Sequence, residues 1–342
     1  MFTSNDIPSG LPLANLRMID IQKLREDDSM EKKQLFLAAR DEGFFYMNFE
    51  SLPELHELED VVDGIYKLEH RLFHLSDTEK NEFDVDKQGP LKLNGYKPIG
   101  RNVGGVEGKR DGFESWAIPK DGVLGIGNVP FNRPAVLDSH VTPLKIFMKY
   151  MQIFTTIVHG ALSDELGIGP QERLESFHRE DSSSPCILRL LKYHAQPATE
   201  RGAVQTPHTD LGSLTFLFTS QPGLQVLPKG ETNDAWQFVA PRKHCAIVNI
   251  GDVLAMMTGG LLQSSLHRVG PLPNLPMDTR YSFAYLQRPE EHTILKTAGA
   301  NGEAITSGEW LRRKFGMLRK NTYVHDKQWI LTGRQEKVIA AI

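Results

Sequence analysis

Apolar side chains recur at helical spacing through much of the first half of the chain. The segments 53–75 and 139–166 place apolar residues every three or four positions, which predicts one buried face on each of two long helices. These residues are Leu55, Leu58, Val61, Val62, Ile65, Leu68 and Leu72 in the first segment, and Leu144, Phe147, Met148, Met151, Phe154 and Val158 in the second. Asp28 and Ser29 offer caps for an earlier helix, and Gly167 suits the end of the longest one.

From about residue 186 the apolar spacing changes to two, which is typical of strands with one buried face. Strand-like runs follow one another without intervening helices, and turn signals such as LPKGETND and NIGD separate them. The runs are ILRLLKYH, SLTFLFT, GLQVLP, AWQFVA, CAIVNI, DVLAMMT, SSLHRV and RYSFAYLQ. This pattern indicates an antiparallel sandwich or barrel, so we predict an eight-stranded, jelly-roll-like core.

The whole pattern predicts one mainly β domain with flanking helices, spanning 1–342. We expect a helical and loop-rich N-terminal region at 1–135, which glycine and proline break into loops and short strands after residue 80. A long supporting helix at 136–170 and the jelly-roll core at 186–300 follow. Thr306 and Glu309 have the spacing of a capping box, which predicts a C-terminal helix and tail at 305–342.

Composition removes several functional classes. The chain has 342 residues with 39 Lys and Arg against 43 Asp and Glu, so its net charge of 39 − 43 = −4 gives no reason to expect a nucleic-acid partner. No uncharged apolar stretch approaches the roughly 20 residues of a membrane span. Two cysteines, Cys186 and Cys245, cannot form a disulfide framework, and the start lacks the features of a secretory signal. We expect a cytoplasmic protein, and a monomer because no helical zipper pattern is visible.

Several catalytic motifs are missing from the sequence. There is no Walker loop, and no GxGxxG that follows a strand and opens a helix. GxSxG, HExxH and CxxC are also absent. Phosphoryl transfer, hydride transfer on a Rossmann scaffold and α/β-hydrolase chemistry therefore lose their support.

Three residues in the strand-rich half have the pattern of a metal site. His208 and Asp210, in PHTDLGSLTFLF, are two positions apart, so in an extended segment their side chains point to the same side. His267 lies 57 residues after Asp210 in SSLHRV, a separation that lets the two segments be neighbours in a jelly roll. Two imidazoles and one carboxylate on one face of an ion leave the other face open, as in the facial triad of non-haem Fe(II) oxygenases.

A carboxylate-binding pair follows the triad. RYSFAYLQ places Arg280 and Ser282 on one strand face, and a guanidinium with a hydroxyl recognises a carboxylate through charge-assisted hydrogen bonds. Tyr193, in ILRLLKYHAQP, has a phenol that can donate to the same carboxylate. Each of these residues also suits an ordinary structural role, and the pair gains meaning only beside the triad.

Taken in order, the segments resemble the isopenicillin N synthase-like branch of the iron(II)/2-oxoglutarate-dependent dioxygenases, and most closely its fungal members. The resemblance covers nearly the whole chain and rests on AARDEGFFYMNF, GYKPIG, PHTDLGSLTFL, GLQV, VNIGDVL, SSLHRV and RYSFAYLQRP. It implies a distorted double-stranded β-helix, a cupin-like jelly-roll variant. The chain departs from the family's NYYP segment, where Leu191 replaces the usual Asn and His194 the usual Pro.

The resemblance also implies an activity and assigns residues to it. His208, Asp210 and His267 match the Fe(2+) ligands, while Arg280, Ser282 and Tyr193 match the residues that hold 2-oxoglutarate. The implied reaction uses 2-oxoglutarate and O2 as cosubstrates, forms succinate and CO2, and hydroxylates or desaturates a small organic molecule, which in fungal members often belongs to secondary metabolism.

The substrate pocket is predicted less directly, from the parts of the chain that form it in the family. Its candidate residues are Tyr96, Asn102, Phe216, Tyr285 and Tyr323. Lys192 and Arg101 are basic side chains that an acidic substrate would contact, although single surface charges are usually solvated.

Three alternatives stay open on the sequence. The first is a 2-oxoglutarate-independent Fe(II) oxidase like isopenicillin N synthase, in which Arg280 and Ser282 hold a substrate carboxylate. The second is a catalytically silent small-molecule-binding protein with the same fold. The third is a zinc hydrolase, since zinc also accepts two histidines and one carboxylate.

Overall fold

The computed structural model describes residues 7–102, 104, 109–127, 129, 131–197, 205–231, 235–273, 275–295 and 304–318. Its helices are α1 (Ile21–Arg25), α2 (Ser29–Asp41), α3 (Leu55–Phe73), α4 (Asp77–Glu82), α5 (Lys120–Leu124), α6 (Ala135–Asp138), α7 (Val141–Glu165), the 3-10 helix η2 (Leu174–Phe177), α8 (Asp252–Met257) and α9 (Ser307–Leu318). Its strands are β1 (Met18–Asp20), β2 (Phe44–Asn48), β3 (Gly95–Lys97), β4 (Phe113–Pro119), β5 (Ile187–Tyr193), β6 (Leu214–Thr219), β7 (Leu224–Val226), β8 (Gln237–Phe238), β9 (Cys245–Ile250), β10 (His267–Val269), β11 (Arg280–Gln287), β12 (Ile294–Leu295) and β13 (Ile305–Thr306).

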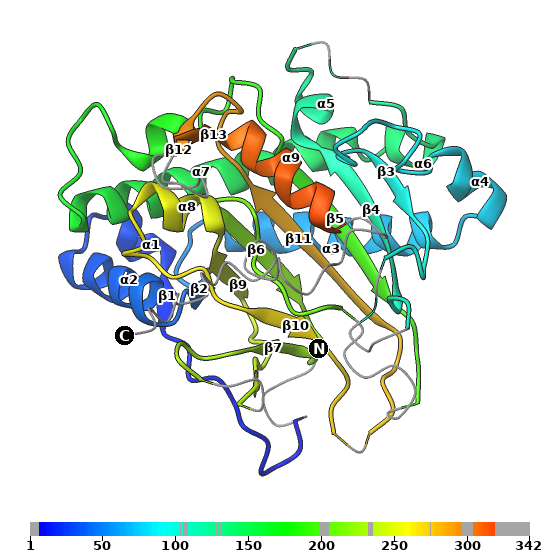
Figure 1. Cartoon of the computed structure of the whole chain (residues 1–342), viewed down its shortest axis with the longest axis horizontal. Coiled ribbons are helices and arrows are strands. Elements are labelled where there is room, and N and C mark those ends of the chain that lie inside the picture. The colour runs from blue at the N-terminus through cyan, green and yellow to red at the C-terminus, as the bar shows by residue number, and fades with distance from the viewer. Residues whose placement is uncertain are drawn as a thin grey trace, which may run out of the picture.

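Two sheets form the centre of the fold (Figure 1). The main sheet has eight strands in the order β1-β2-β9-β6-β11-β5-β4-β3, and the minor sheet has three in the order β10-β7-β8. Every pairing in these sheets is antiparallel except that of β1 with β2. Strands from before residue 120 and after residue 186 therefore share one sheet.

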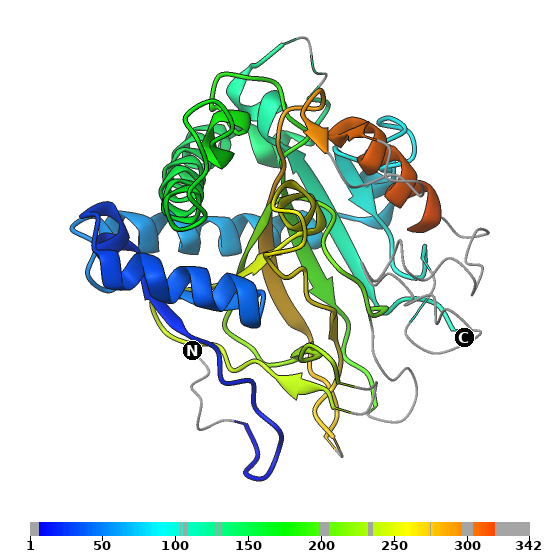
Figure 2. The same cartoon turned by 60° about the vertical axis from the view of Figure 1, so that its left-hand side comes forward.

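Helices α2, α3 and α7 lie on one face of the main sheet (Figure 2). The apolar stripe predicted for 53–75 is buried there, because α3 packs against β5, β11 and α7. The predicted helix at 139–166 is confirmed as α7, and Gly167 ends it with a φ of +63°. That left-handed conformation favours glycine because it has no Cβ.

The other face of the main sheet turns toward the minor sheet and α9 (Figure 2). Successive side chains of β5 point to opposite faces of the main sheet, so they enter two different cores. Leu188 and Leu190 join the large core under the helices, whereas Ile187, Leu191 and Tyr193 join a smaller inner core with residues of β4, β10 and β11. The predicted jelly-roll core is thus confirmed, and its interior is the space that a functional site can use.

Two expectations about individual segments differ from the structure. The run DVLAMMT is not a strand but helix α8, since Asp252 and Val253 donate backbone hydrogen bonds to Asp210 and Gly212 instead of joining a ladder. A short apolar run does not distinguish a strand from a buried helical turn. The region 1–135 is also more than helices and loops, because it supplies β1, β2, β3 and β4 to the main sheet.

The capping box predicted at the start of α9 is present in the structure. The Thr306 hydroxyl accepts a hydrogen bond from the Glu309 backbone N–H at 3.1 Å, and the Glu309 carboxylate accepts one from the Thr306 N–H at 2.7 Å. This reciprocal pair is the predicted capping box, which satisfies two backbone donors at the helix start. Within the described ranges, no helix combines the length and the apolar character needed to cross a membrane.

A buried histidine makes the stability of the fold depend on pH. His178 contacts the Leu174 carbonyl at 2.7 Å and the Ser213 hydroxyl at 2.7 Å, and burial lowers its pKa from 6.5 to about 4. Between these pH values the unfolded chain binds a proton that the folded chain does not, so stability falls as the pH falls. We expect His178 alone to lower the free energy of unfolding by about 2 kcal/mol between pH 7 and pH 5.

Urea unfolding at both pH values measures this effect. His178→Gln is expected to show a smaller loss between pH 7 and pH 5 than the natural chain. An equal loss in both proteins would contradict the assignment to His178.

Candidate metal centre and cosubstrate site

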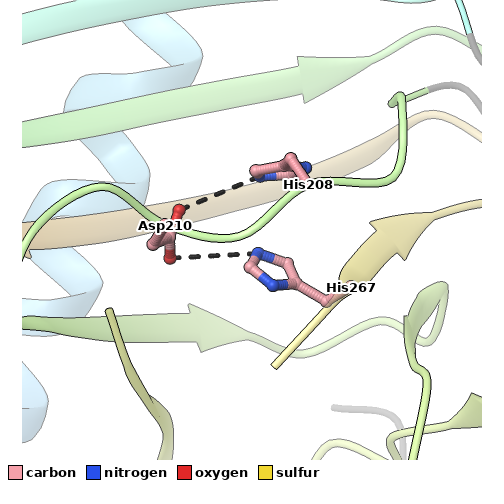
Figure 3. Close-up of side chains that lie close together, drawn as sticks. All are labelled: His208, Asp210 and His267. Atoms are coloured by element: carbon pink, nitrogen blue, oxygen red, sulfur yellow. Dashed lines mark ion pairs between the residues drawn. The ribbon is translucent and has the colours of Figure 1, made fainter. Parts of the chain in front are cut away.

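The three predicted metal ligands meet between the two sheets. His208 lies on the loop before β6, and it forms an antiparallel bridge with His267 at the start of β10. The backbone hydrogen bonds of this bridge measure 3.0 Å and 2.9 Å. Asp210 follows two positions after His208 and turns to the same side (Figure 3). The bridge therefore joins segments that are far apart in the sequence into one constellation.

The ligand atoms of the triad converge on one point. Asp210 Oδ1 lies 3.8 Å from His208 Nε2, and Asp210 Oδ2 lies 3.8 Å from His267 Nε2. All three ligand atoms lie within 4.8 Å of one another, and the described part of the chain holds no second such group. Two nitrogens and one oxygen in this arrangement suit Fe(II) with open coordination positions.

Backbone carbonyls orient both imidazole rings. His208 Nδ1 lies 2.8 Å from the Thr206 carbonyl, and His267 Nδ1 lies 3.1 Å from the Ser265 carbonyl. A carbonyl only accepts, so each Nδ1 carries the proton and each Nε2 presents a lone pair to the site. Burial lowers the pKa of His208 to about 3, so this imidazole is neutral near pH 7, as a metal ligand must be.

Asp210 is fixed by two neighbouring strands. Its Oδ2 accepts hydrogen bonds from the Thr215 hydroxyl of β6 at 2.6 Å and from the Asn249 amide of β9 at 2.9 Å. Although burial opposes the charge, the facing histidines and these two donors hold the pKa of Asp210 below its usual value. The carboxylate is therefore ionised and aimed at the position that a metal would occupy.

The Asn249 contact gives a testable expectation. Removing a group that orients a metal ligand costs about 10- to 100-fold in metal affinity or activity. We expect Asn249→Ala to weaken Fe(II) binding within that range, measured by competition with a chelator. Asn48→Ala is the matched control, because Asn48 ends β2 outside the triad and should leave the affinity unchanged. Equal affinities in the natural chain and Asn249→Ala would contradict the orienting role.

Glycine lets the metal-bearing loop pass close to β11. A Cβ on Gly212 would lie 2.4 Å from the Gln287 carbonyl oxygen, well inside van der Waals contact. The backbone of Ser213 uses this close approach, because its N–H donates to the same carbonyl at 2.9 Å. The glycine in HTDLG therefore sets the distance between the loop and the main sheet.

Arg280 forms the other charged part of the site. Its guanidinium donates to the Ser282 hydroxyl at 2.9 Å, the Thr219 hydroxyl at 3.0 Å and the Pro222 carbonyl at 3.1 Å. Arg280 is 2% exposed, and burial lowers its pKa from the ordinary value. It forms no ion pair with any residue that the structure describes. A buried cation held only by neutral groups is prepared to receive an anion.

The structure brings Tyr193 to the same place. Tyr193 pairs with Arg280 across β5 and β11, and the Arg280 guanidinium lies 5.1 Å from the centre of the Tyr193 ring. The phenol donates to Gln205 Oε1 at 3.1 Å, and Gln205 Nε2 lies 3.3 Å from His208 Nε2. Gln205 thus connects the two halves of the site. Sequence reasoning missed it, since only its position three residues before His208 pointed to it.

The five substrate-pocket candidates do not gather in one place. Tyr96, Phe216 and Tyr285 belong to the large core on the helical side of the main sheet, and Tyr96 donates to Glu114 at 2.7 Å. Asn102 lines a cavity on the inner side of β3, β4 and β5. Tyr323 lies outside the described residues.

The cavity that Asn102 lines contains residues that the sequence analysis did not select. Lys97, Phe113 and Arg189 reach it from the sheet, and Phe315 reaches it from α9. The two basic residues considered for an acidic substrate are instead neutralised. Lys192 pairs with Glu114 at 3.0 Å, and Arg101 pairs with Asp84 at 2.6 Å.

Helix α9 also contacts the metal-bearing loop. Lys314 is 1% exposed, donates to the Thr209 carbonyl at 2.7 Å and to the Thr209 hydroxyl at 2.8 Å, and forms a buried ion pair with Asp252 of α8. Thr209 lies between the two ligands His208 and Asp210. The C-terminal helix is therefore bonded to the segment that carries two of the three predicted metal ligands.

Comparisons with known proteins agree with this geometry. The family model described as the 2OG-Fe(II) oxygenase superfamily matches residues 184–289, and a model described as non-haem dioxygenase in morphine synthesis N-terminal matches residues 16–122. The 2-oxoglutarate-dependent dioxygenase frbH of Dothideomycetidae sp. is 32% identical, over 95% of this chain and 97% of that protein. Oxidoreductase vrtI of Penicillium aethiopicum is 32% identical, over 98% of this chain and 78% of that protein.

Solved structures show the same fold. A full-length Neurospora crassa protein in complex with alpha-KG has a TM-score of 0.70 at 24% identity, over 92% of this chain and 99% of that one. A putative 2OG-Fe(II) oxygenase family protein from Caulobacter crescentus also has a TM-score of 0.70, at 21% identity, over 90% of this chain and all of that one.

The chain belongs to the 2OG-Fe(II) oxygenase superfamily. It is an Fe(II)/2-oxoglutarate-dependent oxygenase, an oxidoreductase whose cofactor is Fe(2+) and whose cosubstrates are 2-oxoglutarate and O2. The predicted resemblance and the predicted class of enzyme are confirmed.

Proposed function

We propose that this enzyme hydroxylates or desaturates a small organic molecule of secondary metabolism, with His208, Asp210 and His267 as the iron ligands. One observation carries the proposal: Gln205 links His208 of the triad to Tyr193, which pairs with the buried Arg280 across β5 and β11. A metal centre and an anion-binding residue in one enclosed space are what the reaction of the family requires. The fungal relatives named as 2-oxoglutarate-dependent dioxygenases support the choice of substrate class.

The residues behind the triad would hold the cosubstrate. Arg280, Ser282 and Tyr193 would bind the distal carboxylate of 2-oxoglutarate, and this contact replaces the water that a buried cation loses. Bound iron and 2-oxoglutarate supply the oxidation: O2, 2-oxoglutarate and substrate R–H give R–OH, succinate and CO2. The chain contributes position, since Thr215 and Asn249 fix Asp210 while two carbonyls fix the imidazole rings.

The finer features of the protein also form part of the proposal. All proposed ligands of the site come from one chain, which supports a monomer. Strands from before residue 120 form both edges of the main sheet around four strands from after residue 186, which supports one domain over 1–342. The free Cys186 and Cys245 support a reducing, cytoplasmic location, and the net charge of −4 supports the absence of a nucleic-acid partner.

Light scattering during size-exclusion chromatography tests the proposed monomer, and a mass of two chains would contradict it.

A spectroscopic titration tests the proposed function. The purified chain is loaded with Fe(II) under anaerobic conditions and titrated with 2-oxoglutarate while the visible spectrum is recorded. We expect a charge-transfer band that saturates at one equivalent and disappears with a chelator, and formation of succinate after O2 is admitted. Iron binding without the band or succinate would favour the 2-oxoglutarate-independent oxidase. A chain that binds no iron would refute the proposed ligand set.

A further inference from the structure

Arg189 lies on the inner face of β5. Alternation along this strand sends Ile187, Leu191 and Tyr193 into the inner core, and Arg189 shares their side. It lines the cavity that also contains Asn102 and Phe315. Arg189 as a whole is half-buried, although its Nε is buried.

The guanidinium of Arg189 has no neutralising partner among the described residues. Its Nε is buried without a hydrogen-bond acceptor, and no ion pair to it is formed within the described ranges. Burial lowers the pKa of Arg189, and the negative charge of Asp210 opposes this shift only in part. Asp210 is the proposed iron ligand, so bound Fe(II) would take up that negative charge.

Two other cations, Lys97 and Arg288, interact electrostatically with Arg189. Lys97 lines the same cavity and is neutralised by Asp111 at 2.6 Å. Arg288, which follows the end of β11, is 2% exposed and donates to the Pro185 carbonyl, and its positive charge acts on Arg189. An uncompensated buried cation is costly, so the cavity favours a ligand that brings a negative charge.

The cosubstrate does not account for Arg189. Arg280 pairs with Tyr193, which lies four residues further along β5 than Arg189. Four residues of strand separate the two backbone positions by about 13 Å. Arg189 pairs with Ala117 of β4, which lines the same cavity, whereas Arg280 is enclosed by Thr219, Ser282 and Tyr193.

We propose that Arg189 binds a carboxylate group of the primary substrate, so that the substrate of this oxygenase is a small organic acid. The inference rests on the proposed function. It places the acid in a cavity lined by Phe315 of α9, the helix whose Lys314 is bonded to Thr209 between two of the proposed iron ligands. A guanidinium binds a carboxylate through two parallel hydrogen bonds, which fixes the direction of the ligand as well as its charge. Phe113 and Phe315 then enclose the apolar part of the molecule, and Asn102 offers a polar contact.

Matched acids and amides test this inference on the anaerobic Fe(II)–2-oxoglutarate complex. The probes are acetate, benzoate, phenylacetate and 3-phenylpropanoate, each compared with its primary amide by calorimetry and by the change in the visible band. Saturating 2-oxoglutarate keeps the acids away from Arg280. We expect at least one acid to bind tenfold or more tightly than its amide. Arg189→Gln should remove that preference and Arg189→Lys should keep part of it.

A control variant on the same strand separates charge from position. Lys192→Gln removes a cation from the opposite face of β5, where Lys192 is paired with Glu114, so the acid preference should persist. An intact band in Arg189→Gln shows that the variant is folded and binds the cosubstrate. The inference is overturned if every acid binds no better than its amide, or if the preference survives in Arg189→Gln. Loss of the band in the natural chain would instead refute the proposed function.

Discussion

His267→Ala is expected to abolish tight Fe(II) binding and to lower succinate formation by at least about 100-fold, since loss of an indirect partner of a ligand already costs 10- to 100-fold. The substitution leaves His208 and Asp210 as two ligands on one loop and removes the only one contributed by the minor sheet. The backbone bridge between β10 and the loop does not need the imidazole, so the fold should persist.

Thermal unfolding with and without Fe(II) measures this prediction independently of turnover. A ligand that binds only the folded state raises the unfolding temperature. The natural chain should show this rise, and His267→Ala should not. His292→Ala is the matched control, because the side chain of His292 is 81% exposed and lies outside the triad. Full iron-dependent stabilisation of His267→Ala would place the metal elsewhere.

Arg280→Gln is expected to raise the KM for 2-oxoglutarate by about 30-fold or more. Truncating one side of a buried, hydrogen-bonded charge pair costs at least about 2 kcal/mol, which corresponds to that factor. The described groups that accept hydrogen bonds from Arg280 are neutral, so the cosubstrate carboxylate would supply the missing counter-charge. Iron affinity measured without 2-oxoglutarate should stay the same.

The informative result for Arg280→Gln is a change in the KM for 2-oxoglutarate without a change in the affinity for iron. Succinate formation at increasing 2-oxoglutarate gives KM, and chelator competition gives the affinity for iron. Arg268→Gln serves as the control, since Arg268 bonds to Gln225 within the minor sheet and stacks on Trp236. A KM that stays unchanged in Arg280→Gln would remove Arg280 from the cosubstrate site. Ser282→Ala should raise KM by a smaller factor, about tenfold, because it removes a single hydrogen bond to a charged group.

The sequence predicted that His208, Asp210 and His267 would lie together, and the structure brings them together. Positions two apart in an extended segment share a side, which was enough to join His208 to Asp210. Placing His267 beside them needed only the expectation that strand-like segments of a jelly roll are neighbours. The long helices were also predictable, since α3 and α7 each bury one clear apolar stripe.

The substrate cavity was harder to predict because both faces of the central strands are buried. Phe216 and Tyr285 lie on strands that carry the site, yet they face the helices on the other side. When both sides of a sheet are apolar, alternation of polarity no longer identifies the inner one. Arg189 escaped notice for the same reason, since its direction follows from the register of β5 with β4 and β11.

The hydrogen bonds from Lys314 to Thr209 tie the sequence of α9 to that of the loop that carries two proposed metal ligands. One helix α9 therefore cannot simply replace another. Two neighbouring residues of this helix have different contacts. Phe315 lines the cavity, and Lys314 donates a hydrogen bond to Thr209, between the proposed ligands His208 and Asp210. Exchanging α9 with that of a relative to alter substrate scope would therefore also exchange a support of the iron. Chimaeras of this enzyme should move α9 together with Thr209 and Asp252, so that the graft keeps its anchor.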